Sequence, residues 1–135
     1  MIDYGFTKQL DTDFESAVEL VKERLRQEGF GIVTTTDLRQ KFEEMFGVDF
    51  ERYLVLAVCD PANTYKAICA EENAGLMLPC NVAVYERKGR TTVAAVRPTV
   101  AIQMIDNPDL KRIAKDIERK LKNVIDSLQP VGAAP

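Results

Sequence analysis

The chain has 135 residues, of which 46% are hydrophobic and 29% are charged. This length and composition suit one globular domain with an ordinary core, and they exclude the low hydrophobicity of a disordered chain. The formal net charge is −3 and the pI is near 5.1. Because binding to nucleic acid or to anionic lipid depends on clustered Lys and Arg, we expect neither a nucleic-acid nor a membrane partner.

Histidine is absent from the chain, and cysteine occurs three times. The missing histidine excludes Ser-His-Asp and Cys-His catalytic sets, the usual zinc ligands and histidine-ligated haem. We expect no cofactor and no metal site, since dispersed thiols would need further ligands to hold an ion. The few cysteines, the lack of signal-peptide features in residues 1–5 and the lack of an apolar stretch of roughly 18 residues predict a cytoplasmic protein with reduced thiols.

The first part of the chain predicts a strand, a helix and a second strand. Residues 2–9 alternate loosely between apolar and polar side chains, as a strand does. Thr12 and Glu15 have the spacing of a capping box, which predicts a helix over about residues 13–28. The apolar stripe of this helix is Phe14, Val18, Val21 and Leu25. The β-rich residues 30–36 then predict the second strand.

The middle of the chain predicts a central strand between two short helices. Asp37 can cap a helix of about two turns, which Gly47 ends. The almost unbroken apolar run 52–59 is typical of a strand covered on both faces, and it is the best candidate for the central strand. Asp60 and Pro61 then form a helix start, with the aspartate as N-cap and the proline as the first helical residue.

The last part of the chain predicts a loop, a hairpin and a long helix. Residues 71–75 are polar or small and predict the loop. Residues 80–87 and 90–97 predict two strands, which the Lys88-Gly89 pair joins by a tight turn. A proline start and a regular apolar stripe predict a long helix over residues 108–128.

Together these elements predict an α+β fold with an antiparallel sheet of about five strands in the order β-α-β4-α. Two main helices are expected on one face, and two short helices are inserted between strands. We expect a single domain over residues 1–129 and a flexible C-terminal tail over residues 130–135, which has nothing to bury.

Both faces of the predicted sheet are apolar. In the central strand, Leu54, Leu56 and Val58 alternate with Val55, Ala57 and Cys59. The first and last helices can cover only one face of a small sheet. The second face therefore needs the two shorter helices, a ligand or another subunit, which predicts a dimer interface or an apolar pocket.

Two cysteines stand beside prolines at strand ends. A thiolate is the strongest nucleophile available to this chain, and the helix start after Cys59 would lower the pKa of a thiol held over it. No Cys-x-x-Cys motif is present, so buried packing is the favoured interpretation of Cys59 and Cys80, and even more so of Cys69. The candidate binding residues are Cys59, Asp60, Pro61, Pro79, Cys80, Asn81 and Tyr85. Cys59 and Cys80 are also the candidate catalytic residues.

A basic cluster surrounds the predicted hairpin and consists of Arg87, Lys88, Arg90 and Arg97. Such a cluster could hold an anionic ligand or partner. Hairpin tips are usually charged because they are solvated and resist edge pairing, so solvated surface is the favoured interpretation.

Several ordered sequence words carry a family resemblance. They are Glu28-Gly29-Phe30-Gly31, Val58-Cys59-Asp60-Pro61, Leu78-Pro79-Cys80-Asn81-Val82 and the helix from Asn107 to Leu128. Over roughly residues 4–128 the chain resembles the domain-of-unknown-function 302 family. The resemblance implies a curved antiparallel sheet like that of the TATA-binding-protein-like α+β fold, in a homodimer, and it implies no established activity.

We therefore expect a homodimeric binding module for a small apolar ligand or a partner protein. The alternative is a thiol-dependent redox enzyme or sensor that uses Cys59 or Cys80. Whether the protein is an enzyme stays open at this point.

Overall fold

The computed structural model describes residues 2–128, and the predicted tail over residues 130–135 lies outside the described residues. The strands are β1 (Gly5–Leu10), β2 (Gly31–Asp37), β3 (Tyr53–Cys59), β4 (Cys80–Arg87) and β5 (Arg90–Val96). The helices are α1 (Phe14–Gln27), α2 (Leu38–Phe46), α3 (Pro61–Ala70), α4 (Pro98–Ala101) and α5 (Pro108–Asp126), with a 3₁₀ helix η1 (Glu72–Leu76). All strand pairs are antiparallel, in the spatial order β1-β5-β4-β3-β2. The predicted α+β class with a five-stranded antiparallel sheet is confirmed.

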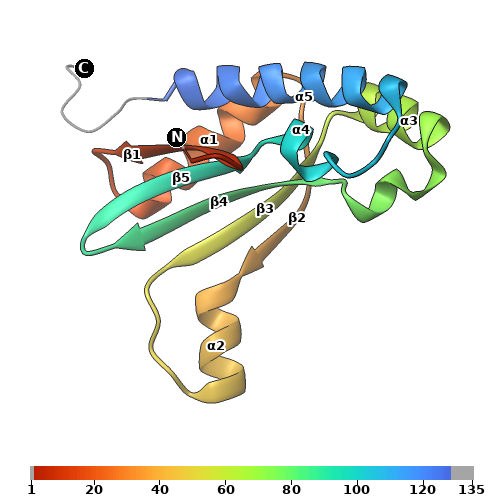
Figure 1. Cartoon of the computed structure of the whole chain (residues 1–135). Coiled ribbons are helices and arrows are strands. Elements are labelled where there is room, and N and C mark those ends of the chain that lie inside the picture. Colours follow the sequence, from red (N-terminus) through yellow and green to blue (C-terminus); the bar gives the residue numbers. More distant parts are fainter. Residues whose placement is uncertain (1, 129–135) are drawn as a thin grey trace.

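The main core lies between the sheet and the two long helices α1 and α5, which share one face of the sheet (Figure 1). On β3, Leu56 and Val58 turn into this core and are fully buried. Helix α1 contributes Val21 and Leu25, and α5 contributes Leu121, all of them without solvent exposure. The apolar stripes predicted for the first and last helices are therefore the sides that pack on the sheet.

A second, smaller core lies beyond the end of the strands, where α3, η1 and α4 meet the first half of α5 (Figure 1). It consists of Ala67, Ala74, Ile102, Leu110 and Ala114. Because α3 packs beside α5, it lies on the helical side of the molecule. This inserted helix therefore leaves the second face of the sheet uncovered.

The other inserted helix, α2, projects on the side of the sheet that faces away from α1 and α5 (Figure 1). Asp37 is both the last residue of β2 and the N-cap of α2, and its carboxylate accepts a hydrogen bond from the backbone N–H of Gln40 at 3.0 Å. Gly47 ends the helix with φ +67°, as predicted from a residue that adopts the left-handed conformation at little cost.

Three local predictions were wrong. The N-cap of α1 is Asp13 and not Thr12, because Asp13 directly precedes the first helical residue and its carboxylate reaches the N–H of Ser16 at 3.1 Å. The first strand begins at Gly5 rather than at residue 2. The predicted loop over residues 71–75 is largely η1, and α4 was not predicted, because such short helices leave no apolar periodicity to recognise.

Within residues 2–128, no helix combines the length and the apolarity that crossing a membrane requires.

Candidate functional site

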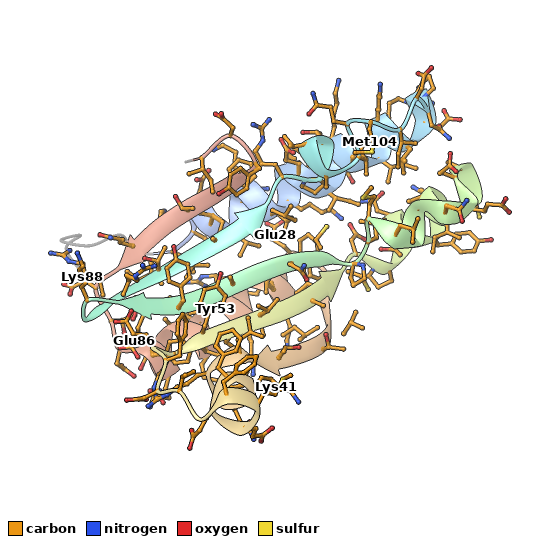
Figure 2. All side chains as sticks on the ribbon, turned by 60° about the horizontal axis from the view of Figure 1, so that its bottom comes forward. Glu28, Lys41, Tyr53, Glu86, Lys88 and Met104 are labelled. Carbon is orange, nitrogen blue, oxygen red and sulfur yellow. The ribbon has the colours of Figure 1, made fainter. Side chains whose placement is uncertain are left out.

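The face of the sheet that points away from α1 and α5 has no helix lying across it, and we call it the open face. Successive side chains of a strand point to opposite faces, so the open-face residues alternate with buried residues such as Leu56 and Val58. The open face consists of Thr7, Gln9, Thr34, Thr36, Tyr53, Val55, Ala57, Cys59, Asn81, Ala83, Tyr85, Thr92 and Ala94. In Figure 2, strands β3, β4 and β5 lie in front of the long helices when this side is turned forward.

The open face is neutral and its centre is small. Val55 on β3 pairs with Ala83 on β4, which in turn pairs with Ala94 on β5, and all three side chains are half-buried. Among the strand residues that the structure describes, charge enters this face only at the hairpin end, with Arg87 and Arg90. An uncharged floor of small side chains suits close packing by an apolar surface and offers no cationic side chain to an anionic ligand.

Aromatic side chains stand at one end of the open face. Tyr53 and Tyr85 are cross-strand partners whose rings stack with centroids 5.1 Å apart and planes 9° from parallel. Beside the sheet, Phe42 of α2 meets Phe50 edge to face at 5.2 Å. In Figure 2, Tyr53 lies at the end of the sheet nearest α2, which carries Lys41. Rings at this end add flat apolar area next to the small-residue floor.

Helix α2 and the loop after it expose four large apolar side chains, which we call the α2 patch. They are Met45, Phe46, Val48 and Phe50, with exposures of 69%, 68%, 46% and 45%. No residue of α2 itself is buried among the described residues. Exposed apolar residues scattered singly are ordinary, but four within six positions form a contiguous patch that suits contact with another apolar surface.

The cysteines do not share one site. Val58 pairs with Cys80, so Cys80 turns into the core with 3% exposure, whereas the neighbouring Cys59 is half-buried on the open face. Burial, with a smaller effect from Cys59, raises the pKa of the Cys80 thiol to about 12. A thiol of this kind stays protonated at neutral pH, which disfavours Cys80 as a nucleophile. Cys69 is exposed, so the prediction that it packs in the interior was wrong; the side of α3 that packs in the second core carries Ala67 instead.

Asp60 belongs to a polar network between α3 and α5. It caps α3 with 5% exposure, and one carboxylate oxygen accepts hydrogen bonds from Lys120 Nζ at 2.6 Å and from Asn63 Nδ2 at 2.8 Å. The same Asn63 amide donates to Asp116 at 2.8 Å. Burial by itself would raise the pKa of Asp60, but the hydrogen bonds from Lys120 and Asn63 outweigh it and hold this pKa below its ordinary value. The network is satisfied internally, so its function here is to join two helices.

The remaining candidate residues divide between the open face and other parts of the surface. Pro61 is the exposed first residue of α3, and Pro79 is exposed just before β4. Asn81 and Tyr85 lie on the open face with Cys59. The structure therefore brings Cys59, Asn81 and Tyr85 to one surface and places the other four predicted residues elsewhere.

The apolar cavity near the second core is too small to be a ligand site. A narrow apolar cavity lies between the sheet end and the second core, and its wall includes Ala67, Met77, Cys80, Ile102 and Ala114. Its volume of about 10 Å³ is that of a single water-sized sphere, so it holds no organic ligand. Within residues 2–128, no group of three or more Cys, Asp or Glu side chains is arranged to hold a metal ion.

The basic side chains are engaged in ion pairs or dispersed. Arg52 pairs with Glu15 and, at 3.6 Å, with Glu86. Arg97 pairs with Glu118 at 3.3 Å and so does not join the hairpin tip. The predicted basic cluster is thus confined to the exposed tip itself.

Comparison with known proteins identifies the family. Residues 6–128 match the family model described as "Domain of unknown function DUF302". The chain belongs to the DUF302 family. A comparison of this DUF302 protein with curated proteins found no match. Its structure is similar to the one titled "Crystal structure of uncharacterized conserved protein DUF302 from Bacillus stearothermophilus", with 31% sequence identity, 95% of this chain and 100% of that chain covered, and a TM-score of 0.88. The resemblance proposed from the sequence is confirmed, and the family description assigns no activity.

Sequence reasoning missed the α2 patch. The periodicity of Phe42 and Met45 was visible and predicted the helix, but periodicity predicts burial and does not reveal that the buried partner is missing. The only available signal was the shortness of the helix together with the further apolar residues Phe46, Val48 and Phe50 close behind it.

Proposed function

We propose that this DUF302 protein is a homodimeric binding module whose open face is its contact surface. The observation that carries the proposal is the neutral, small-residue open face that neither inserted helix covers. The centre of this face, with Val55, Ala57, Ala83 and Ala94, is apolar, and apolar sheet surface is normally covered. A second copy of the chain can supply such a cover without any further molecule. Two-fold association through one shared surface is the commonest arrangement of oligomers.

The test places a charge at the centre of the open face. In the Ala83→Glu variant, a buried carboxylate would face the partner without a counter-charge. The dimer dissociation constant should therefore rise at least a hundredfold. The molecular mass in solution, measured by sedimentation over a wide range of protein concentration, reports this change. The matched control is Ala62→Glu, the same substitution at an exposed position on α3. A wild-type protein that stays monomeric at every concentration would refute the homodimer.

A small apolar ligand is the other occupant that the open face could take. The uncharged dye Nile red distinguishes the two occupants. If the open face binds a small apolar ligand, the fluorescence of the dye should increase with the wild-type protein and should not increase with Ala83→Glu. A dimer that excludes the dye supports self-association as the function of the open face. A monomer that binds the dye there supports a ligand instead.

A further inference from the structure

We infer that in the dimer each copy's α2 patch packs on the open face of the other copy. This inference rests on the proposed function and names the element that makes the contact. The two exchanged contacts are identical, as a two-fold axis requires. Each copy contributes its α2 patch to one contact and its open face to the other.

Helix α2 touches β3 but buries little of its apolar side within its own chain. A nine-residue helix is too short to be stable by itself in water, and helices in proteins are stabilised mainly by packing of their apolar side. Here Leu38 is half-buried and Phe42 meets Phe50, while Met45 and Phe46 are about two-thirds exposed. A helix of this kind is expected to pack against a surface of another molecule.

Helix α2 cannot cover the open face of its own chain. Asp37 ends β2 and caps α2 at once, so no linker allows the helix to swing. Residues 47–52 return directly to β3. The helix is thereby held beside β2 and β3, projecting from the side of the open face without lying across β4, β5 and β1 (Figure 1).

The side chains of the open face and of the α2 patch are complementary in size. The open face offers Val55, Ala83 and Ala94 as a floor of short side chains, and the patch offers Met45 and Phe46 as long ones. Long side chains that enter spaces above short ones give the interdigitated packing of protein interiors, and Met adapts to irregular gaps. A nine-residue helix is about 13 Å long, which spans roughly three strands at about 4.8 Å spacing.

The area of the open face is limited. Five strands of about six residues, spaced about 4.8 Å apart with about 3.3 Å per residue, present a face of roughly 450 Å². A stable interface buries about 800 Å² on each partner. The open face alone is therefore too small, and the exposed α2 patch of each copy enlarges the contact toward this size.

The test removes one large side chain of the patch. In Phe46→Ser, the dimer dissociation constant measured by sedimentation should rise at least tenfold, while the monomer still unfolds cooperatively because α2 contributes nothing buried to either core. The matched control is Leu76→Ser, at an apolar side chain of η1 that is 82% exposed. If Ala83→Glu dissociates the dimer and Phe46→Ser does not, α2 is not the covering element, although the proposed function stands.

A cross-link locates the contact directly. One copy carries Phe46→Cys and the other carries Ala83→Cys, both in a background whose three native cysteines are replaced by alanine. The two variants are mixed, and a short bismaleimide is added. The expected product joins one chain of each variant, and mass spectrometry identifies it because one of the two variants is isotope-labelled. Products that join only chains of the same kind, or none, would overturn the proposed exchange.

Discussion

Asp60 combines two interactions that the sequence and the fold determine separately. Its role as N-cap follows from the next residue, Pro61, and could be predicted. Its ion pair with Lys120 spans 60 positions along the chain and depends on how α5 lies beside α3. Local signals predict the first interaction only, since no spacing rule connects residues that meet through tertiary packing.

The Asp60→Asn variant separates these interactions, because asparagine caps helices about as well as aspartate does but carries no charge for Lys120. We expect the free energy of unfolding at pH 7 to fall by about 1–3 kcal/mol, the usual worth of hydrogen bonds to charged groups. Denaturant titration measures this loss. The matched control Asp13→Asn makes the same change at the exposed cap of α1 and should alter stability little.

The pH dependence of this difference has a definite sign. The pKa of Asp60 is lowered in the folded protein, so its ion pair stabilises the fold above the ordinary pKa of 3.8 and is lost as the pH falls through the lower folded value. The gap between wild type and Asp60→Asn should therefore be constant from pH 7 to about pH 5. It should close below pH 3.8. A gap that persists at the lowest pH at which the protein stays folded would assign the loss to packing rather than charge.

The three cysteines should differ in reactivity according to their surroundings. Cys69 is exposed, Cys59 is half-buried and Cys80 is buried with a raised pKa of about 12. Timed alkylation of the native protein at pH 8, followed by peptide mapping, should label them in that order, with Cys80 labelled only on unfolding. Fast labelling of Cys80 in the folded protein would contradict this order and return the thiol hypothesis to consideration.

At the scale of elements, Asn107 joins two helices whose contact the sequence did not reveal. Its side-chain oxygen caps α5 by accepting from the N–H of Leu110 at 3.1 Å, and its amide nitrogen donates to the carbonyl of Ala70 at the end of α3 at 2.8 Å. Together with Asp60 at the other end, it fastens α3 to α5 on both sides of the second core.

The Asn107→Asp variant keeps the cap and loses the donor, because a carboxylate can only accept hydrogen bonds. It leaves the carbonyl of Ala70 facing a negative charge, so we expect a loss of about 1–2 kcal/mol in stability. Hydrogen exchange should speed up in the last turn of α3 and in η1, while the amides in the middle of α5 keep their protection. Uniform acceleration across both helices would show that the bond does not act locally.

Elements with a strong local pattern were predicted, and those without one were not. The β4–β5 hairpin followed from Lys88-Gly89, which turn with φ values of 53° and 77° as a two-residue hairpin loop requires. The long helix α5 followed from its proline start and apolar stripe. Helix α4 is a single turn that begins at Pro98 and packs against α5, and it is too short for any apolar stripe.

For the whole molecule, the decisive property is the difference between the two faces of one sheet. The sequence predicted apolar side chains on both faces of the central strands, and it left open which of the short helices, a ligand or another subunit covers the second face. The answer depends on where α3 and α2 point after strands β3 and β2, and that direction comes from tertiary packing rather than from any residue pattern. The predicted site residues lie on different surfaces for the same reason. Cys59 and Cys80, for example, are near each other but on opposite faces of the sheet.

Two identical substitutions on one strand separate the faces. Val58 is fully buried against the helices, so Val58→Ala should lower the free energy of unfolding by roughly 2–3 kcal/mol at every protein concentration, through lost burial and the cavity left behind. Val55 is half-buried on the open face, so Val55→Ala should cost a dilute monomer less than about 1 kcal/mol. In a dimer its cost appears as weaker association, and the melting temperature should then fall more at high than at low protein concentration, because only the native dimer is stabilised by mass action.

Melting curves of both variants over a hundredfold range of protein concentration measure this difference. A Val55→Ala effect that is as large as that of Val58→Ala and independent of concentration would mean that the open face is covered within the single chain, and the proposed contact surface would have to be abandoned.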